Sequence, residues 1–150
     1  MKTPVLAILQ NMWVKDPERL KRMFTYHGEE FRLAMMRRLL FAGSKTGRNL
    51  KKAFGDDLLA KITFEETTRE IAGDPKTIYP ADLQHLAICL ERHRPEVVLT
   101  FGKIAEDAWR KTRCDFDRPL HLAAHHPASR HPSSWQTLTE AAAKLREYLG

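Results

Sequence analysis

The chain has little cysteine and no long apolar run. Its two cysteines, Cys89 and Cys114, cannot by themselves form a disulfide framework or a four-thiolate metal site. They fit a reducing compartment, and we expect a cytoplasmic protein. No apolar run approaches the ~18 residues that a membrane span needs, and the first nine residues lack the apolar core and cleavage site of a secretory signal. We therefore expect no membrane partner.

Linkers, internal repeats and low-complexity tracts are also missing from the 150 residues. At ~100–200 residues per domain, this length predicts a single domain over residues 1–150, and we expect it to be a monomer. Hydrophobic residues make up 43% of the chain and charged residues 29%, which is typical of a globular protein and unlike a disordered one. A chain of this size can bury a core without metals or disulfides.

Positive charge is abundant and unevenly placed. The formal net charge is +6, and residues 1–52 hold 12 Lys or Arg against 4 Asp or Glu, whereas residues 53–150 hold 13 against 15. A one-sided positive field attracts phosphate backbones. The same charges also suit a solvated helix face, and charge alone does not choose between these interpretations.

Short apolar runs alternate with helical patterns along the chain. Strands are predicted for Val5–Leu9, residues 61–64, Val97–Phe101 and residues 119–124. Helices are predicted where apolar residues recur with helical spacing, namely in residues 17–25, 29–40, 50–54, 81–93, 104–109 and 134–149.

Four short strands separated by helices predict an α/β fold. Its architecture would be a three-layer α/β/α sandwich around a central four-stranded, mainly parallel sheet. Ligands of such folds bind outside the carboxyl ends of the strands. The residues that directly follow each strand are therefore the candidate functional residues.

Polar and aromatic side chains follow the first and third predicted strands. Gln10, Asn11 and Trp13 come after the first strand. An amide there can orient a water or bond a base edge, and a Trp can stack on a base, although a turn residue and a core anchor are the simpler interpretations. Gly102 and Lys103 follow the third strand, where Gly permits a tight turn and the helix N-terminus can meet an anion.

Histidines cluster after the fourth predicted strand, where four of the seven lie between His121 and His131. Histidine is the natural acid, base or neutral hydrogen-bond donor near neutral pH. Together with Cys114, His121, His125 and His131 have tolerable spacing for metal ligands. However, no HExxH helix or paired CxxC is present. We therefore expect no metal and no other cofactor. A metal-dependent hydrolase built on these histidines is kept as a hypothesis that ranks behind the two described below.

Four stretches together resemble the uracil-DNA glycosylase superfamily, over about residues 5–149. LQNMW at residues 9–13 stands where that family has its first catalytic motif. FAGSKTGRNL at residues 41–50 is similar to its Phe-x-Gly…Gly-x-x-Leu helix entry, and RPEVVLTFGKIA at residues 94–105 to its RPxVVxxxGxxA strand and turn. HPAS at residues 126–129 is similar to its His-Pro-Ser motif.

The resemblance implies a DNA glycosylase that excises uracil or another deaminated base by hydrolysis of the N-glycosidic bond, as in base excision repair. Its partner would be single- or double-stranded DNA, from which the nucleotide is extruded into a pocket. By position, Asn11 would hold the attacking water. His126 would donate a hydrogen bond to the base carbonyl and stabilise the leaving anion.

The same resemblance implies a set of DNA contacts. Ser129 would bond a phosphate, and Arg130 lies where the family places residues that wedge into the duplex. Backbone N–H groups of residues 43–47 would approach a phosphate. The candidate DNA-binding residues are Gly43, Ser44, Lys45, Gly102, Lys103, Ser129 and Arg130.

The sequence departs from the family's pattern at the base pocket. Leu9 and Met12 replace a Gly and a Pro of the first motif, and Leu9 would narrow or reshape the pocket. The family's base-reading Asn after the second strand is missing; Phe64 could stack on a base there, and Glu66 could accept a hydrogen bond from an amino group, which suits cytosine-like or purine-like edges better than uracil. With Gln10 and Trp13, these two are the candidate base-binding residues. Two cysteines cannot hold the four-thiolate iron–sulfur cluster of some branches.

These departures keep a second hypothesis open. The chain could be a catalytically silent, glycosylase-like module that binds nucleic acid or a nucleotide without cleaving it. Such a module would bind DNA in a salt-sensitive way and release no base.

Other residues have simpler structural interpretations. Cys89 lies on an apolar helix face and is expected to be a small buried hydrophobe. We expect Trp135 to anchor the last helix, His85 and His93 to be solvated, and the adjacent arginines 37 and 38 to solubilise their helix.

Overall fold

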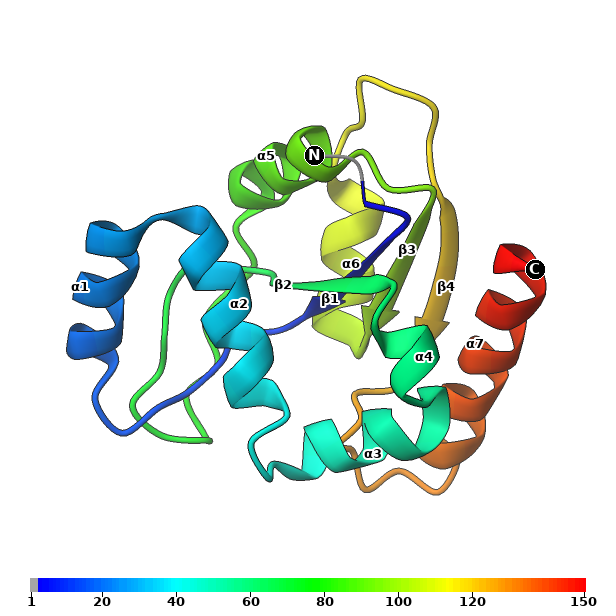
Figure 1. Cartoon of the computed structure of the whole chain (residues 1–150), viewed down its shortest axis with the longest axis horizontal. Coiled ribbons are helices and arrows are strands. Elements are labelled where there is room, and N and C mark those ends of the chain that lie inside the picture. Colours follow the sequence, from blue (N-terminus) through cyan, green and yellow to red (C-terminus); the bar gives the residue numbers. More distant parts are fainter. Residues whose placement is uncertain (1–2) are drawn as a thin grey trace.

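A parallel sheet forms the centre of the structure, a computed structural model that describes residues 3–150. Within these residues the sheet has four strands, β1 (Val5–Leu9), β2 (Ile62–Glu66), β3 (Val97–Phe101) and β4 (Leu120–Ala124). They lie in the order β2-β1-β3-β4, and every neighbouring pair is parallel (Figure 1). The predicted α/β class is confirmed, and the sheet is wholly rather than mainly parallel.

Seven helices accompany these strands in the described part of the chain. They are α1 (Pro17–His27), α2 (Glu29–Leu40), α3 (Lys45–Phe54), α4 (Asp56–Leu59), α5 (Leu83–His93), α6 (Lys103–Lys111) and α7 (Ser134–Leu149). Side-chain oxygens cap three of them, because the first N–H groups of a helix lack partners within the helix. Asp16 accepts from Arg19 N–H, Ser44 from Gly47 N–H, and Asp82 from His85 N–H.

Several predicted boundaries shift. The helix expected at residues 50–54 begins at Lys45, because Ser44 caps it, and two other shifts also have local reasons. The helix expected from residue 81 begins at Leu83, because Asp82 is its cap. The second strand, expected to end at residue 64, continues through Glu65 and Glu66, which stand in register with Ile8 and Leu9 of β1. Two adjacent acidic residues are unusual in a buried strand, and partners elsewhere in the chain account for the first of them.

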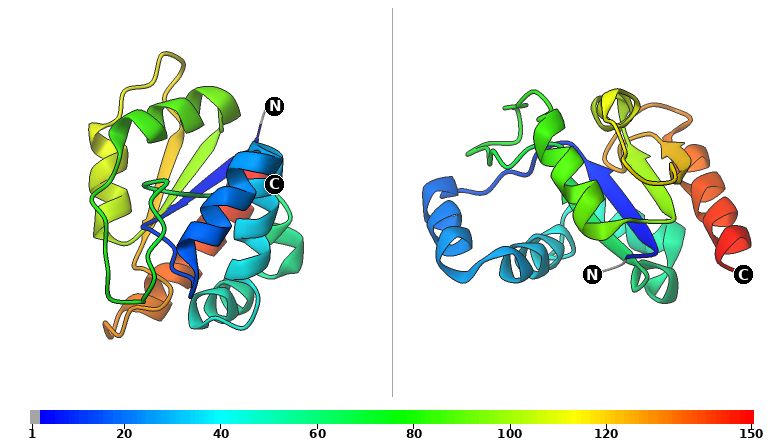
Figure 2. Two further views of the ribbon diagram at one scale, coloured as in Figure 1. Left: turned by 90° about the vertical axis from the view of Figure 1, so that its left-hand side faces the viewer. Right: turned by 90° about the horizontal axis from the view of Figure 1, so that it is seen from above.

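The sheet is covered on both faces. Alternate side chains of a strand point to opposite faces, so Val5, Ala7 and Leu9 meet a core formed with α3, α4 and α7. Leu6 and Ile8 meet a second core formed with α5 and α6. Figure 2 shows the helices on the two sides of the sheet. This arrangement is the expected three-layer α/β/α sandwich.

Helices α1 and α2 form a hairpin beside β2, with a small core of its own. Leu20, Phe24, Met36 and Ile71 are its buried members. The hairpin stands to the left of the sheet in Figure 1, and α2 contacts β2. It therefore adds a side wall next to the carboxyl end of that strand.

Several expectations about single residues are wrong. His85 and His93 are each only 5% exposed, because they lie on the inner side of α5. Trp135 is 49% exposed and does not anchor α7. Arg37 donates hydrogen bonds of 2.8 Å to the backbone carbonyls of Leu59 and Ile62, so it joins α2 to the start of β2 instead of merely solubilising its helix.

None of the helices in residues 3–150 combines the length and the apolarity that crossing a bilayer requires.

Candidate functional site

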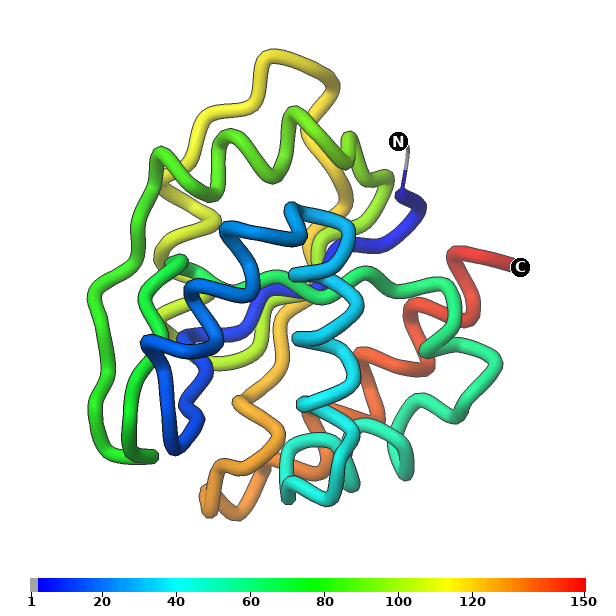
Figure 3. Tube along the Cα trace, turned by 60° about the vertical axis from the view of Figure 1, so that its left-hand side comes forward, coloured from blue at the N-terminus to red at the C-terminus, as the bar shows by residue number. Residues whose placement is uncertain are grey.

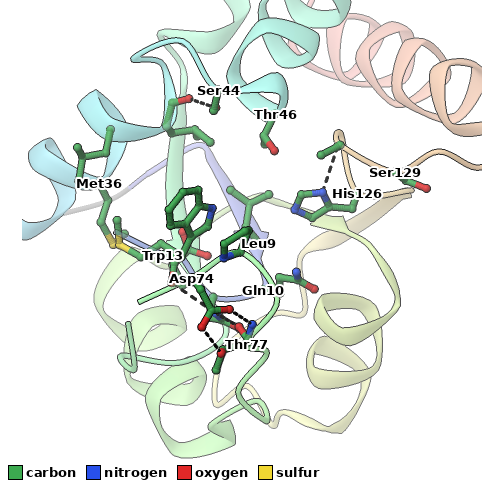
Figure 4. A pocket seen from close by; sticks show the side chains of 17 residues that line it. Leu9, Gln10, Trp13, Met36, Ser44, Thr46, Asp74, Thr77, His126 and Ser129 are labelled. Atoms are coloured by element: carbon green, nitrogen blue, oxygen red, sulfur yellow. Dashed lines mark hydrogen bonds between the residues drawn. The ribbon is translucent and has the colours of Figure 1, made fainter. Parts of the chain in front are cut away.

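A cavity of about 420 Å³ opens at the carboxyl ends of the strands. Roughly 300–1,000 Å³ is usual for a pocket that holds a small ligand. Figure 4 shows the cavity between the end of β1, the α2–α3 turn and the segment after β4. The lining residues are Leu9, Gln10, Asn11, Met12, Trp13, Met36, Leu39, Leu40, Ser44, Thr46, Glu66, Asp74, Pro75, Thr77, His126, Ala128 and Ser129.

His126 enters this cavity directly after β4. Its Nδ1 atom accepts a hydrogen bond of 3.1 Å from the backbone N–H of Ala128. Because that nitrogen is an acceptor, the neutral ring carries its proton on Nε2. Burial lowers the pKa of His126, since the charged ring loses its hydration. The site therefore holds a neutral imidazole that can donate from Nε2.

The position of His126 depends on a close approach by Gly102. A β-carbon added at residue 102 would lie 3.4 Å from the β-carbon of His126, and Gly102 has a φ of +93°. Gly102 N–H also donates to the carbonyl of Ala124, at 2.9 Å. Gly102 thus supports the histidine from the end of β3, and Lys103 is exposed at the start of α6.

The neighbouring His125 points elsewhere. Its backbone N–H donates to Thr137 Oγ1 at 3.0 Å, and its Nδ1 atom lies 3.2 Å from Ser134 Oγ, both on α7. Its ring packs edge-to-face with that of His131, with 4.7 Å between ring centroids. Of the two adjacent histidines, His126 is the one that lines the cavity.

Asn11 lines the cavity and also holds a loop. Its Nδ2 donates to the carbonyl of Thr77 at 3.1 Å, and its Oδ1 accepts from Tyr79 N–H at 3.0 Å. An amide oxygen has two lone pairs, so Oδ1 can still accept one further hydrogen bond, for example from a water. The structure therefore gives Asn11 a structural contact in addition to its place at the cavity.

Glu66 brings a carboxyl group from β2 into the cavity wall. Its Oε2 atom is shielded from solvent and has no hydrogen-bond partner within residues 3–150. Burial and the charge of Glu65 raise the pKa of Glu66 well above its ordinary value, and Arg32 lowers it to a smaller extent. The group remains neutral at pH values where an exposed Glu is ionised. It can then donate as well as accept, unlike the acceptor considered from the sequence.

Glu65 explains why Glu66 lacks a cation. Its carboxylate is fully buried, and Arg32 Nη2 of α2 lies 2.5 and 2.8 Å from its two oxygens. The Cys89 thiol donates to the same carboxylate at 2.8 Å. Cys89 is buried as expected, but it is a hydrogen-bond donor rather than only a small hydrophobe, and burial raises its pKa. Arg32 is thus committed to Glu65, and Glu66 Oε2 has no hydrogen-bond partner among the described residues.

The other base-pocket candidates divide into two groups. Gln10, Trp13, Leu9 and Met12 line the cavity, and Trp13 is 49% exposed. The two departures from the family motif, Leu9 and Met12, therefore form part of the wall but leave an open volume. Phe64 is only 5% exposed and lies in the core, where its ring packs edge-to-face with that of Phe41 at 5.7 Å.

Apart from Gly102 and Lys103, the candidate DNA contacts lie on two segments that touch each other. Lys45 and Asn49 of α3 reach the segment after β4: Asn49 Nδ2 donates to the carbonyl of Pro127 at 2.7 Å, and Lys45 Nζ lies 3.5 Å from the carbonyl oxygen of Ala128. Ser44 and Ser129 line the cavity. Their neighbours in the chain, Gly43 and Arg130, are exposed. Figure 3 shows the α2–α3 turn and this segment side by side at one end of the molecule.

The histidine cluster does not assemble as a metal site in residues 3–150. His121 Nε2 lies 2.8 Å from Thr100 Oγ1, and its ring packs against Trp109, away from His125 and His131. Among the described residues, one trio does place ligand atoms within 4.8 Å of one another: Glu65, His85 and Cys89. Arg32 already pairs with this carboxylate, and its positive charge opposes a cation there.

Sequence reasoning missed part of the cavity wall. Asp74, Pro75 and Thr77 come from the long segment between β2 and α5, and Thr46 comes from the first turn of α3. Asp74 Oδ1 accepts from the N–H groups of residues 76 and 77, and its Oδ2 from Thr77 Oγ1. These hydrogen bonds, the one from the Thr77 hydroxyl first, lower the pKa of Asp74. An Asp-Pro pair is typical of a loop, but nothing in it indicates that the segment returns to the end of β1.

No protein-family model matches this chain, and no curated protein matches it.

Proposed function

We propose that this protein is a DNA glycosylase of the uracil-DNA glycosylase type. It would hydrolyse the N-glycosidic bond of a deaminated base that has been flipped out of DNA into the cavity. The observation that carries the proposal is the neutral His126, held by Ala128 N–H so that its Nε2–H can be donated inside the cavity.

The chemistry needs a donor of this kind. Cleavage of the C1′–N bond leaves negative charge on the base, and this charge spreads onto the carbonyl oxygens. A donor fixed before the reaction stabilises such charge more in the transition state than in the ground state. The Nε2–H of His126 would serve one carbonyl oxygen, and the free lone pair of Asn11 Oδ1 would orient the attacking water.

The surroundings of the cavity also suit DNA. Lys45 and the first turn of α3 lie at its rim, and helix N-termini and lysines both favour phosphates. Trp13 is half exposed at the cavity and offers a ring on which a base can stack. The excess of positive charge in residues 1–52 acts in the same direction.

A base-release assay with a matched histidine control tests the proposal. Oligonucleotides that carry uracil, hypoxanthine or xanthine, single- and double-stranded, are incubated with the protein and then cleaved with alkali at abasic sites. We expect His126→Ala to slow release by about 10²–10³-fold, the usual cost of losing one such donor. His125→Ala should leave the rate nearly unchanged, because His125 faces α7. Equal rates in the two variants would refute the assignment of His126.

The second candidate function is the silent binding module. The observation that favours it is the use of both polar atoms of the Asn11 amide by the 77–79 backbone. Absence of base release on every substrate, together with DNA binding that weakens as salt rises, would support this module over the enzyme.

A further inference from the structure

A second cavity, of about 240 Å³, lies between the α1–α2 hairpin and the segment after β2. Met12, Met36 and Glu66 line both this cavity and the one described above, so the two spaces share a wall. The rest of its lining comes from α1, α2 and residues 68–71, which do not line the first cavity. The proposed base excision makes no use of this second space.

The walls of the second cavity carry more positive than negative charge. Lys21 of α1, Arg32 of α2 and Arg69 of the segment after β2 line it. Its two acidic residues are Glu66 and Glu70. Burial raises the pKa of Glu66 well above its ordinary value, so Glu66 carries no charge at pH values where an exposed carboxyl is ionised. A negatively charged ligand therefore matches these walls better than a cation does.

Arg32 brings a buried guanidinium to the second cavity, and one of its nitrogens has a poor partner. The residue is only 3% exposed. Its Nε donates to Glu29 and its Nη2 to Glu65, whereas Nη1 lies 3.2 Å from Met36 Sδ. A thioether sulfur is a weak acceptor. Nη1 is therefore a buried cationic donor that an oxygen of a ligand would satisfy better.

Lys21 and Arg69 also keep donors beyond those in their ion pairs. Lys21 Nζ lies 3.2 Å from a carboxylate oxygen of Glu70 and 3.7 Å from one of Glu18. Arg69 Nη2 lies 2.7 Å from Glu29 Oε1. An ammonium has three N–H donors and a guanidinium has five. A bound oxyanion would therefore add to these ion pairs without having to break them.

Two neutral groups in the wall can donate to the same ligand. Glu66 Oε2 is shielded from solvent and has no hydrogen-bond partner within residues 3–150. Thr68 is 5% exposed; its hydroxyl accepts from Glu70 N–H at 3.1 Å and can still donate its own proton. A shielded polar atom without a partner costs free energy. An acceptor bound in this cavity would remove that cost.

Another part of the wall is apolar. Phe24, Met36 and Ile71, which are buried members of the hairpin core, line the cavity together with Met12. Burial of apolar ligand surface against such side chains is favourable, and Met side chains adapt to different shapes. A bare inorganic anion would leave these contacts unused, whereas an anion with an apolar body would make them.

We propose that the second cavity binds a small carboxylate with an apolar body, such as an aromatic acid. The carboxylate would accept hydrogen bonds from Arg32 Nη1 and from Arg69, because a guanidinium and a carboxylate are planar groups of matching geometry. The apolar body would lie against Phe24 and Ile71. Arg32, Arg69 and Phe24 have no part in the proposed base excision, so this ligand site stands apart from it.

Isothermal titration calorimetry of the DNA-free protein with three probes tests the site. Benzoate has both the charge and the apolar body, benzamide is its neutral counterpart of similar shape, and inorganic phosphate has the charge alone. We expect benzoate to bind saturably with a Kd of about 1 mM or tighter. The other two should bind roughly 10-fold or more weakly, because each lacks one of the two sets of contacts.

Arg69→Ala and Arg110→Ala are a matched pair of variants. The two arginine side chains are 50% and 66% exposed, and each pairs with a Glu, at 2.7 and 2.8 Å. Arg110 lies on α6 and does not line the cavity. Arg69→Ala should weaken benzoate binding by about 10-fold, the effect of losing a charge-assisted hydrogen bond, and Arg110→Ala should leave it unchanged. Urea unfolding verifies that each variant is folded, and Lys21→Ala replaces Arg69→Ala if the latter does not fold.

The outcomes that would overturn the proposal are distinct from those that bear on the glycosylase. If benzoate shows no saturable binding to the wild type, or the same Kd with Arg69→Ala as with Arg110→Ala, the site is refuted. Benzamide or phosphate that binds as tightly as benzoate would refute the carboxylate as the ligand class. None of these titrations depends on base release, so the two proposals stand or fall by separate measurements.

Discussion

Glu66 shows how a residue's chemistry is set by what its neighbours have already used. Its partner in sequence, Glu65, takes the guanidinium of Arg32, whose Nε bonds Glu29 and whose Nη1 lies 3.2 Å from Met36 Sδ. Glu66 consequently stays a neutral acid that can both donate and accept. A flipped base with adjacent carbonyl and N–H groups would match such a carboxyl without the repulsion that an ionised one would cause.

The ionisation of Glu66 predicts a pH-dependent cost to stability. Because its pKa is raised in the folded state, the folded protein binds more protons than the unfolded chain above about pH 4.3. The contribution of Glu66 to the free energy of unfolding is therefore largest at low pH and is lost as pH rises toward its folded pKa. Urea unfolding of the wild type and of Glu66→Gln from pH 4.5 to 9 should show the Gln variant gaining relative stability. A difference in the free energy of unfolding between the two proteins that does not change with pH would contradict the raised pKa of Glu66.

Some of these residues could be located from sequence and others could not. The rule that ligands bind at strand ends brought out Asn11 and the histidines after the fourth strand, because position along the chain is enough for it. The choice of His126 and of Glu66 depended on the resemblance to the glycosylase motifs. The strand-end rule could not predict the environment of Glu66. That environment depends on Arg32, which lies 33 residues from Glu65 in the chain and pairs with Glu65 only after α2 docks. The histidines of α5 were misjudged because the pattern of leucines alone did not show how wide its buried face is.

At the scale of elements, α3 is held close to α2 by the lack of a side chain at residue 47. A β-carbon added to Gly47 would lie 2.2 Å from the carbonyl oxygen of Leu40 and 3.1 Å from the α-carbon of Phe41. Both contacts are with backbone, which cannot rotate away. The N-terminal turn of α3, with Ser44 and Thr46 in the cavity wall, thus depends on this close approach.

Substitution of Gly47 by Ala should therefore shift α3 and harm both stability and activity. Overpacking of a tight contact costs about 1–3 kcal/mol in the free energy of unfolding. The shift would also disturb the contacts of Lys45 and Asn49 with the segment that carries His126. Urea unfolding and base release are the measurements. Gly73→Ala is the control, because residue 73 has no positive φ and an added β-carbon there meets nothing closer than 3.8 Å. Wild-type stability in Gly47→Ala would contradict the packing described.

The elements themselves were largely predictable. Strand β1 is an uninterrupted apolar run, and β3 is interrupted only by Thr100. Both strands lie at the centre of the sheet, where such runs are expected. The end of β2 was missed because Glu65 and Glu66 do not resemble buried strand residues. Helix α4, only four residues long, is too short to leave a periodic pattern.

At the scale of the whole molecule, four histidines are kept neutral by the fold. Burial is the main cause that lowers the pKa of His85, His93, His121 and His126. The unfolded chain, with ordinary histidines near pH 6.5, binds more protons than the folded protein below that value. The free energy of unfolding should therefore fall as pH drops from about 7 to 5. Glu66 acts in the opposite sense, so the fall should be steeper in Glu66→Gln; a urea midpoint that stays level over this range would refute the prediction.

The sheet order also bears on the sequence of events by which the domain assembles. β1 pairs with β2 on one side and with β3 on the other, with Val5 opposite Ile62 and Val97, and β4 pairs with β3. Pairings between segments so far apart in sequence form late and slow the folding of a domain. Until β3 is in place, one edge of the apolar strand β1 has no partner strand. Because His126 follows β4, the wall of the cavity is complete only after these long-range pairings have formed.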